Sequence, residues 1–455
     1  MRNRRNRLST DLRLAWLLTR GSDRREWWRV LLTAVGAGGA TGIGLAVATL
    51  AALDGQYSVS FGAGLLNQPS DRQGVIVALL MLLVPVLGFL GQCARVGAVH
   101  RDRRLAALRL AGAAPAQVRR IAALEAGLAC LAGSAVATVF CVLLLLRVWQ
   151  APEPMAWLGI ALVAVTVPAL GAAVSALSLR RVVSSPLGWV RRVRPTRGPG
   201  RAFVALTGLL AATALLTGLA TVHGDSLDHT LVPLTVFTAS LLTGVSAVWL
   251  AGWASGRLGT ALAARAQRPA LLIAAERLRD DPWAAARTHA AVLLVTVVGT
   301  AFVGIREVLT QFVNSSDDLA EYASYYTTGL DLSGAAILVA LVLTLSGLAV
   351  GTAESLVTRR RGLAAQAAAG VPQSVLGRAL LLETALPLAP AVLLAGAGGT
   401  AIHMGWAGML DDAAGGVPLV PVLVPVAVYA ACLLAAATSL PLLRRTVRPA
   451  ELRYV

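Results

Sequence analysis

Residues 75–125 read VIVALLMLLVPVLGFLGQCA (75–94), RVGAVHRDRRLAALRLAGAAPAQVRR (95–120) and IAALE (121–125). The first segment has twenty residues and no charge, which is enough to cross the hydrocarbon core of a bilayer as a helix. The second carries seven arginines, so it belongs in water rather than in lipid. The third opens another apolar run, which continues to about residue 146. The stretch therefore predicts two membrane-spanning helices joined by a polar elbow.

The elbow itself has the composition of a helix, a turn and a second helix. Leu105, Leu108 and Leu110 give the first piece one apolar side. Gly112 permits a helix stop, and Pro115 favours the start of the next helix. We therefore expect the chain to reverse direction at residues 112–115.

A second elbow follows 258 residues later, where residues 361–372 read RGLAAQAAAGVP. Five residues of the first elbow recur at this one offset, namely Arg103 at Arg361, Leu105 at Leu363, Gly112 at Gly370, Arg120 at Arg378 and Glu125 at Glu383. Three upstream positions match as well: Leu14 with Leu272, Asp23 with Asp281 and Arg29 with Arg287. The matches indicate a tandem duplication in the same orientation.

The rest of the chain has the composition of a polytopic membrane protein. It is 56% hydrophobic and 14% charged, with a mean hydropathy of +0.70, whereas soluble domains are about a quarter charged. Ten apolar runs are expected to span the membrane: 30–53, 75–94, 121–146, 155–178, 203–222, 230–253, 288–305, 332–356, 379–402 and 417–440.

The predicted fold class is therefore all-α, an integral membrane protein of about ten transmembrane helices. Two tandem four-helix units, residues 1–192 and 267–455, are joined by a connection of two helices within residues 193–266. Within each unit an amphipathic stretch precedes the first span, at 9–20 and at 270–279.

Arginine alternates along the chain in a way that predicts the topology. Segments on one side of the ten spans hold 37 of the 40 basic residues. The positive-inside rule places these segments, and both termini, in the cytoplasm of a cell whose inner or plasma membrane holds the protein. Membrane lipid thus accounts for the net charge of +17, and nucleic acid is not an expected partner.

All 40 basic residues are arginine. A Walker A loop requires a lysine to reach the β- and γ-phosphates of a nucleotide, so an ordinary ATP site is excluded from this chain. No catalytic motif and no metal-binding spacing stands out either. We expect a protein that is not itself an enzyme, with no catalytic residue, no metal site and no cofactor of its own.

Three acidic residues fall near the elbow ends of predicted spans: Glu125, Glu383 and Glu354. Intramembrane acids are candidates for function, so these are our candidate intramembrane polar residues. Glu125 and Glu383 each follow an arginine, Arg120 and Arg378, after about a turn and a half. Each glutamate could form an ion pair with its arginine or take part in proton transfer. Both interpretations stay open, and the ion pair is favoured.

The opposite side of the predicted spans has only short loops, which lean acidic. Their one aromatic cluster is Tyr322, Tyr325 and Tyr326, beside Asp318 and Glu321. Solvated loops are the simpler interpretation, and a resting place for a cationic or amphiphilic ligand is the alternative.

The two elbows resemble the FtsX-like permease family, the permease subunits of macrolide-exporter-type ABC transporters. The resemblance rests on LAGAAPAQV (110–118) and, more loosely, on AGVPQSVL (369–376), together with the ten-span topology. It implies that each elbow docks on a cytoplasmic ABC ATPase dimer, which binds the ATP and Mg. It assigns ATPase coupling to Arg103, Leu105, Leu108, Arg109, Gly112, Ala113, Pro115, Gln117, Arg361, Leu363, Gly370, Val371, Pro372 and Gln373.

The resemblance further implies export or extraction of a substrate, or transmission of force across the membrane. Members of the family commonly carry a large extracytoplasmic domain, and the loops here are too short for one. A hydrophobic or amphiphilic peptide, drug or lipid taken from the membrane fits such a chain, as does a separate extracellular or lipoprotein partner. Two alternatives stay open: an ion-coupled secondary transporter, and a signalling subunit that regulates a cell-wall enzyme without transport.

Overall fold

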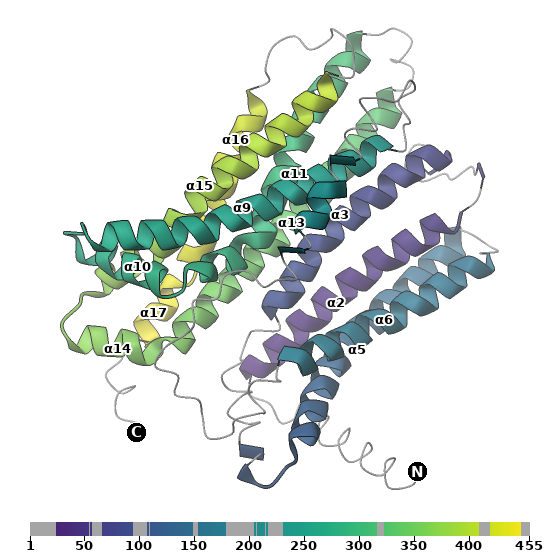
Figure 1. Ribbon diagram of the computed structural model, residues 1–455. Coiled ribbons are helices and arrows are strands. Elements are labelled where there is room, and N and C mark those ends of the chain that lie inside the picture. The colour runs from purple at the N-terminus through teal and green to yellow at the C-terminus, as the bar shows by residue number, and fades with distance from the viewer. Residues whose placement is uncertain are drawn as a thin grey trace. The chain divides into compact units, whose positions relative to one another are not determined.

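The computed structural model describes residues 24–53, 55–56, 66–93, 107–108, 110–148, 153–178, 204–205, 207–213, 215–216, 231–315, 323–408 and 419–446. Every regular element in these residues is a helix (Figure 1). Nine of the described helices are long and apolar enough to cross a membrane, so the described part of the chain is all-helical and compatible with a multi-pass membrane protein. The expected span at 203–222 is described only in part, at 204–205, 207–213 and 215–216.

All the candidate membrane-spanning helices except the last are longer than the apolar runs that predict them. They are α2 (Arg24–Ala51), α3 (Pro69–Cys93), α5 (Pro115–Val148), α6 (Pro154–Ser178), α9 (Leu231–Ala263), α11 (Pro282–Ser315), α13 (Ala323–Thr358), α15 (Gln373–Ala407) and α16 (Val420–Ala437). Short helices α10 (Pro269–Asp280), α14 (Arg360–Ala368) and α17 (Leu440–Thr446) adjoin them. A proline opens α3, α5, α6, α10 and α11, where its missing N–H and fixed φ cost nothing.

The chain forms two compact units. One comprises residues 1–54 and 86–193, and the other comprises residues 55–85 and 194–455. Most of α3 thus belongs to the second unit, although it precedes α5 and α6 in the sequence.

Helices α2, α5 and α6 pack against one another in the first unit. Glycine permits the closest of these contacts, because a Cβ on Gly38 would lie 3.2 Å from the carbonyl oxygen of Gly133. A Cβ on Gly133 would overlap the carbonyl oxygen of Ala34. Small residues bring membrane helices together in this way, since lipid offers no hydrophobic force for association.

Replacing Gly133 by alanine is expected to destabilise the first unit by about 2 kcal/mol, because the new methyl group forces α5 away from the α2 backbone. Thermal unfolding in detergent checks this. Gly42→Ala on α2 is the matched control, since a Cβ there meets nothing within 4 Å. Equal stability of the two variants would contradict the close packing of α2 on α5.

The core of the second unit lies where α9, α11 and α15 pack on one another, with α16 against α11 and α15. Its fully buried side chains are small or aliphatic, among them Ala247, Leu293 and Leu388. A Cβ on Gly399 of α15 would lie 2.6 Å from the carbonyl oxygen of Val297 on α11, so these two backbones nearly touch. Alanine and glycine thus set the spacing of the central helices.

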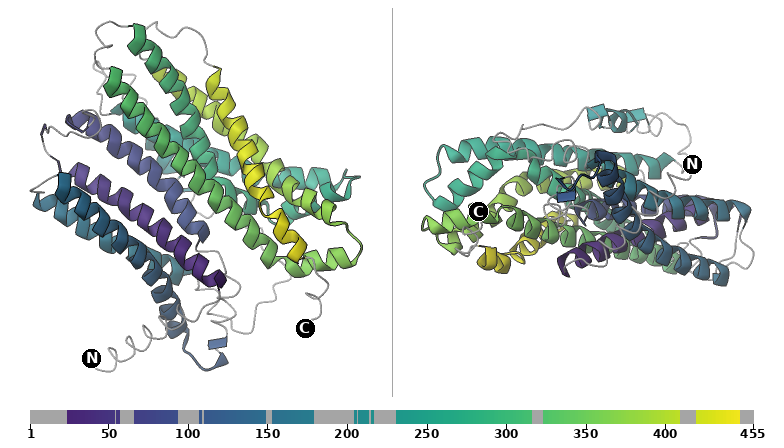
Figure 2. Two further views of the ribbon diagram at one scale, coloured as in Figure 1. Left: turned by 180° about the vertical axis from the view of Figure 1, so that it is seen from behind. Right: turned by 90° about the horizontal axis from the view of Figure 1, so that it is seen from below.

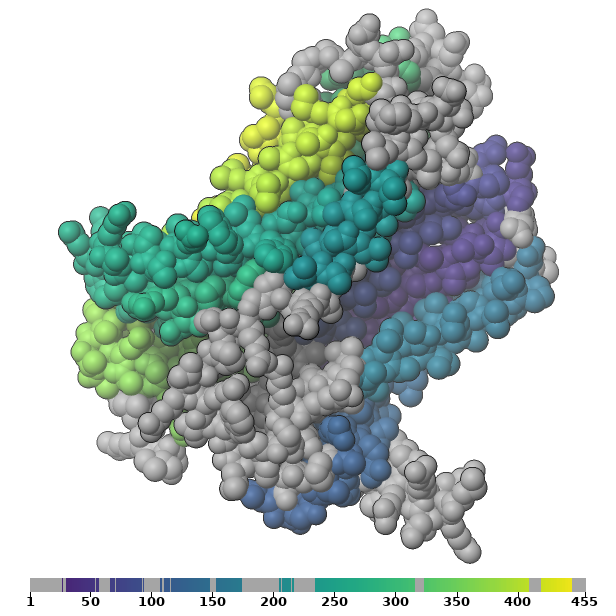
Figure 3. Space-filling model, viewed as in Figure 1, coloured from purple at the N-terminus to yellow at the C-terminus, as the bar shows by residue number. Residues whose placement is uncertain are grey.

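The short helices α10, α14 and α17 lie together at one end of the second unit (Figures 1 and 2). The helix expected at 270–279 is confirmed as α10, which packs against α9 and α15. Arg287 donates to Asp281 at 2.6 Å across the break between α10 and α11. The space-filling view shows the light-green residues around α14 open at the surface, bordered by the teal residues of α10 (Figure 3).

Candidate functional site

The second elbow joins α13 to α15 by way of α14 and a glycine cap. Gly370 has φ +89°, a left-handed conformation that side chains with a Cβ avoid. The N–H of Gly370 donates to the carbonyl of Ala367 at 2.9 Å, and the N–H of Val371 donates to Gln366 at 3.1 Å. These two bonds form a Schellman motif, which ends α14. Pro372 then caps the start of α15, as its fixed φ of −62° favours.

The first elbow has the same construction. Gly112 has φ +95°, and the N–H of Ala113 donates to the carbonyl of Leu108 at 3.0 Å. Pro115 is the first residue of α5. Both glycines lie in open space, since a Cβ on either would meet no atom within 4 Å. Backbone conformation, rather than crowding, is therefore the reason for glycine at both positions.

Four backbone hydrogen bonds correspond between the elbows at the offset of 258 residues. Ala111 to Ala107 (2.9 Å) matches Ala369 to Ala365 (3.0 Å), and Ala113 to Leu108 (3.0 Å) matches Val371 to Gln366 (3.1 Å). Gln117 to Ala114 (3.0 Å) matches Val375 to Pro372 (3.0 Å), and Val118 to Ala114 (3.1 Å) matches Leu376 to Pro372 (3.3 Å). The two elbows therefore have the same local pattern of backbone hydrogen bonds.

The residues of the second elbow to which the resemblance assigns coupling divide into an exposed set and a buried one. Arg361, Gly370, Pro372 and Gln373 are exposed, and Val371 is half-buried. Leu363 is buried, with 2% of its surface accessible, so it holds α14 in place rather than meeting a partner. In the first elbow Gly112 is exposed, while Leu108, Ala113 and Gln117 are half-buried. Arg103, Leu105 and Arg109 lie outside the described residues.

An apolar cluster fixes the second elbow to the helices behind it. Leu356 of α13, Leu363 of α14, Leu376 and Leu380 of α15 and Leu443 of α17 form it. Val371, the residue after the capping glycine, packs against the same cluster. A smaller cluster in the first elbow joins Val118 and Ala122 to Leu108 and Ala113. Each elbow is thus packed against the helix that follows it.

Glu383 lies behind the second elbow and ties three segments together. Arg359, at the junction of α13 and α14, donates to one carboxylate oxygen at 2.7 Å. Arg277 of α10 donates to the other at 3.3 Å. The carboxylate side chain is 19% exposed, so water screens these bonds only partly. We call this arrangement of Arg277, Arg359 and Glu383 the clamp.

Among the described residues, the ion-pair partners of Glu383 are therefore these two arginines and not Arg378, the residue favoured from the sequence. The reason is helical geometry. Residues five apart point away from each other, whereas residues three or four apart are neighbours. Arg378 is exposed, while Glu383 faces the interior. Sequence reasoning missed Arg277 and Arg359 because both lie on other helices.

The other two acids occupy different environments. Glu125, the counterpart of Glu383, is buried at 3% exposed, and Glu354 is half-buried on α13. At the same offset Arg101 corresponds to Arg359, so the sequence repeats both an acid and a base of the clamp. Arg101 lies outside the described residues.

A small polar cavity of about 80 Å³ adjoins the clamp. His289 lines it, 3% exposed, with Nδ1 placed 2.8 Å from the carbonyl oxygen of Ala285. Nε2 of His289 is buried, and no described residue reaches it with a hydrogen bond. Thr352 and Thr384 contribute hydroxyl groups to the same walls. The cavity is large enough for ordered water, which would satisfy the imidazole.

No protein-family model matches this sequence, and no curated protein or solved structure is significantly similar to it. The site therefore has to be interpreted from its own geometry. That geometry is two exposed, glycine-capped elbows, each packed against a membrane-spanning helix, with an ionic clamp behind the second.

Proposed function

We propose that this chain is the membrane-spanning permease subunit of an ABC transporter, FtsX-like in its organisation, with two tandem units and ten spans. A separate ABC ATPase would dock on the two elbows. One observation carries the proposal: the elbows share a glycine cap and four backbone hydrogen bonds at a single offset, and a proline stands at the start of the helix that follows each elbow. Equivalent elbows suit a dimeric partner, because each protomer can make the same contact.

The connection between elbow and membrane helices supports the same function. α14 is packed on α15 and α17 through the apolar cluster and lies next to Arg359 of the clamp. A push on the elbow would therefore move α13, α14 and α15 together, with α10 attached through Arg277. Rigid coupling of this kind is what an ATPase needs in order to displace helices in a membrane.

ATP hydrolysis would take place in the partner, since the chain has no lysine for a Walker A loop. The positive-inside distribution would place elbows, termini and ATPase in the cytoplasm, below an inner or plasma membrane. The transported substrate would be hydrophobic or amphiphilic, taken from the membrane or passed to an extracellular partner.

Co-expression with an ABC ATPase encoded beside this chain is expected to yield a stable complex whose ATPase rate depends on the permease. A cysteine placed at exposed Gln373 is expected to cross-link to the ATPase with a short reagent, because Gln373 stands at the open side of the elbow. A cysteine at exposed Thr327 of α13, far from the elbow on the same helix, is the control. A complex that cross-links equally at both positions, or no complex at all, would contradict docking at the elbows.

An ion-coupled transporter is the second candidate, and one observation favours it. His403 of α15 is 1% exposed, and both of its ring nitrogens are buried. Its ring faces the carbonyl of Gly399 and the charge of Glu307, and Oε2 of Glu307 is also buried and unsatisfied in the described part of the chain. Substrate uptake driven by a proton gradient in vesicles without ATPase, and lost in His403→Gln, would decide for this candidate.

A further inference from the structure

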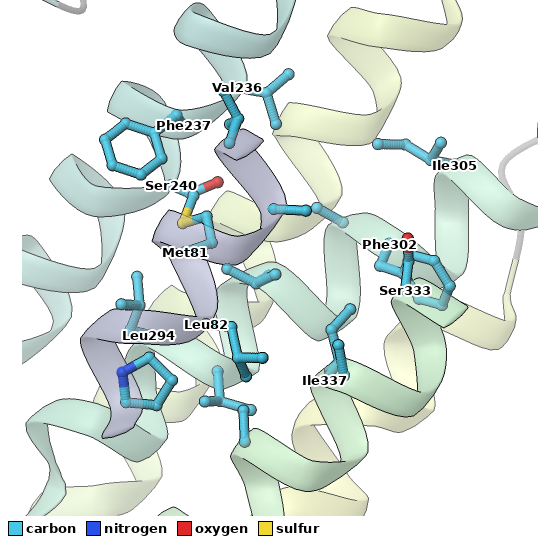
Figure 4. Close-up of a pocket in the computed structure, with 18 of the residues that line it drawn as sticks. Met81, Leu82, Val236, Phe237, Ser240, Leu294, Phe302, Ile305, Ser333 and Ile337 are labelled. Carbon is cyan, nitrogen blue, oxygen red and sulfur yellow. The ribbon is translucent and has the colours of Figure 1, made fainter. Parts of the chain in front are cut away.

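A cavity of about 320 Å³ in the second unit is lined by α3, α9, α11 and α13, with Trp406 of α15 (Figure 4). Met81 and Leu82 of α3 face it, as do Phe237 of α9, Phe302 of α11 and Ile337 of α13. Among its described lining residues, only Ser240, Ser333 and Trp406 have a nitrogen or oxygen atom in the side chain. None of its described lining residues carries a charge.

The cavity occupies the half of the helices that lies away from the elbows. On α13 it runs from Ser333 to Ala340, while the elbow follows residue 358. On α3 it runs from Gly74 to Pro85, or about 16 Å at the rise of an α-helix. The hydrocarbon core of a bilayer is about 30 Å thick, so this length corresponds to one leaflet.

Along the cavity, α3 is not closely packed against the other described helices. Its backbone makes little close contact with any other described helix. A Cβ on Gly74, which lines the cavity, would meet no atom within 4 Å. One polar contact joins α3 to α13 at the end away from the elbows, a side-chain hydrogen bond between Asp71 and Tyr325. The cavity lies between the two helices on the elbow side of this hydrogen bond.

Three fillings of the space can be compared. Left empty, the lining would lose its dispersion contacts on one side. Water would fill it with roughly ten molecules, yet Ser240 and Ser333 carry the only hydroxyl groups among its described lining residues, and an ordered water needs two to four polar partners. Hydrocarbon restores the contacts and requires no polar partner, and the lining helices are themselves apolar enough to span a membrane.

We propose that this cavity is a binding site for one hydrocarbon chain of a membrane amphiphile, taken from the leaflet away from the elbows. The polar head would remain at the rim, where Tyr325 binds Asp71 and Arg306 binds Asp331 at 2.8 Å. The site does not depend on an ATPase at the elbows, so its test uses this chain alone.

The test is photolabelling of the full chain in phosphatidylcholine vesicles that contain a phosphatidylcholine with a diazirine at the tail end. Met81, Phe302 and Ile337 are expected to be labelled, and the labelling should saturate as the probe fraction rises. Leu338 and Val339 are the internal comparison, because they are exposed on α13 at 63% and 54% but do not line the cavity. Their labelling should rise in proportion to the probe.

Ala336→Phe is expected to lower labelling at Met81 and Ile337 by roughly tenfold, because its ring occupies the cavity. Ala335→Phe is the matched control, since Ala335 is next to Ala336 on α13 but is exposed and lies outside the cavity. Gel filtration of both variants verifies that they fold. Labelling at Met81 that stays proportional to the probe, or that survives Ala336→Phe in a folded protein, would overturn the site while leaving the elbow proposal untouched.

Discussion

Replacing Gly370 by valine is expected to weaken binding of the proposed ATPase partner by roughly tenfold, because a side chain with a Cβ avoids the left-handed backbone at a cost of about 1–2 kcal/mol. The valine releases the hydrogen bonds that end α14, so the exposed Pro372 and Gln373 lose their fixed orientation. Co-purification and permease-dependent ATP hydrolysis measure the effect. Gly112→Val tests the first elbow in the same way.

Two variants separate backbone conformation from size. Asparagine tolerates the left-handed region, so Gly370→Asn is expected to keep most of the binding. Gly362→Ala alters another exposed glycine, which lies within α14, and a Cβ there also meets nothing within 4 Å. It should bind as the unmodified chain does. If Gly370→Val and Gly362→Ala bind equally well, the glycine cap at residue 370 is not needed for binding, and the prediction is wrong.

Removing the carboxylate of the clamp by Glu383→Ala is expected to lower the free energy of unfolding by about 2 kcal/mol, since two partly buried arginines lose their partner. Arg359 is 36% exposed, and water offsets part of the loss. Denaturant or thermal unfolding in detergent measures the change. The variant is also expected to uncouple ATP hydrolysis from helix movement, because α10 and the junction of α13 and α14 are no longer tied to α15.

An exposed ion pair of similar length provides the control. Arg306 and Asp331 are 2.8 Å apart, but their side chains are 47% and 66% exposed, so Asp331→Ala should cost less than about 1 kcal/mol. A double-mutant cycle on Arg359 and Glu383 should give a coupling free energy of about 1 kcal/mol or more. A coupling free energy near zero would mean that the contact between Arg359 and Glu383 does not stabilise the protein.

The sequence predicted the features that depend on neighbouring residues. Helices long enough to span a membrane follow from unbroken apolar runs, and nine of them are present in the described residues. Gly112 and Gly370 were expected at helix ends, and both have the positive φ that a Schellman cap needs. α10 appeared where an amphipathic stretch was expected. The roles assigned to these elements stay predictions until a partner is found.

The clamp and the cavity could not be predicted, because each depends on residues far apart in the chain. Arg277 and Glu383 are separated by 106 residues and meet only after α10 packs on α15. The cavity needs α3 beside α13, and the sequence gives no sign that residues 55–85 join the second unit rather than the first. Apolar runs look alike on every face, since lipid and protein interior are equally apolar.

The sequence by itself determined a multi-pass helical membrane chain, the alternation of its arginines and the local form of two elbows, since hydropathy and backbone preference act over a few residues. Tertiary packing alone decided which arginines hold Glu383, that Leu363 faces inward, and that an apolar space remains between α3 and its neighbours. Those outcomes depend on how close the helices come, and the small residues at their crossings set that distance.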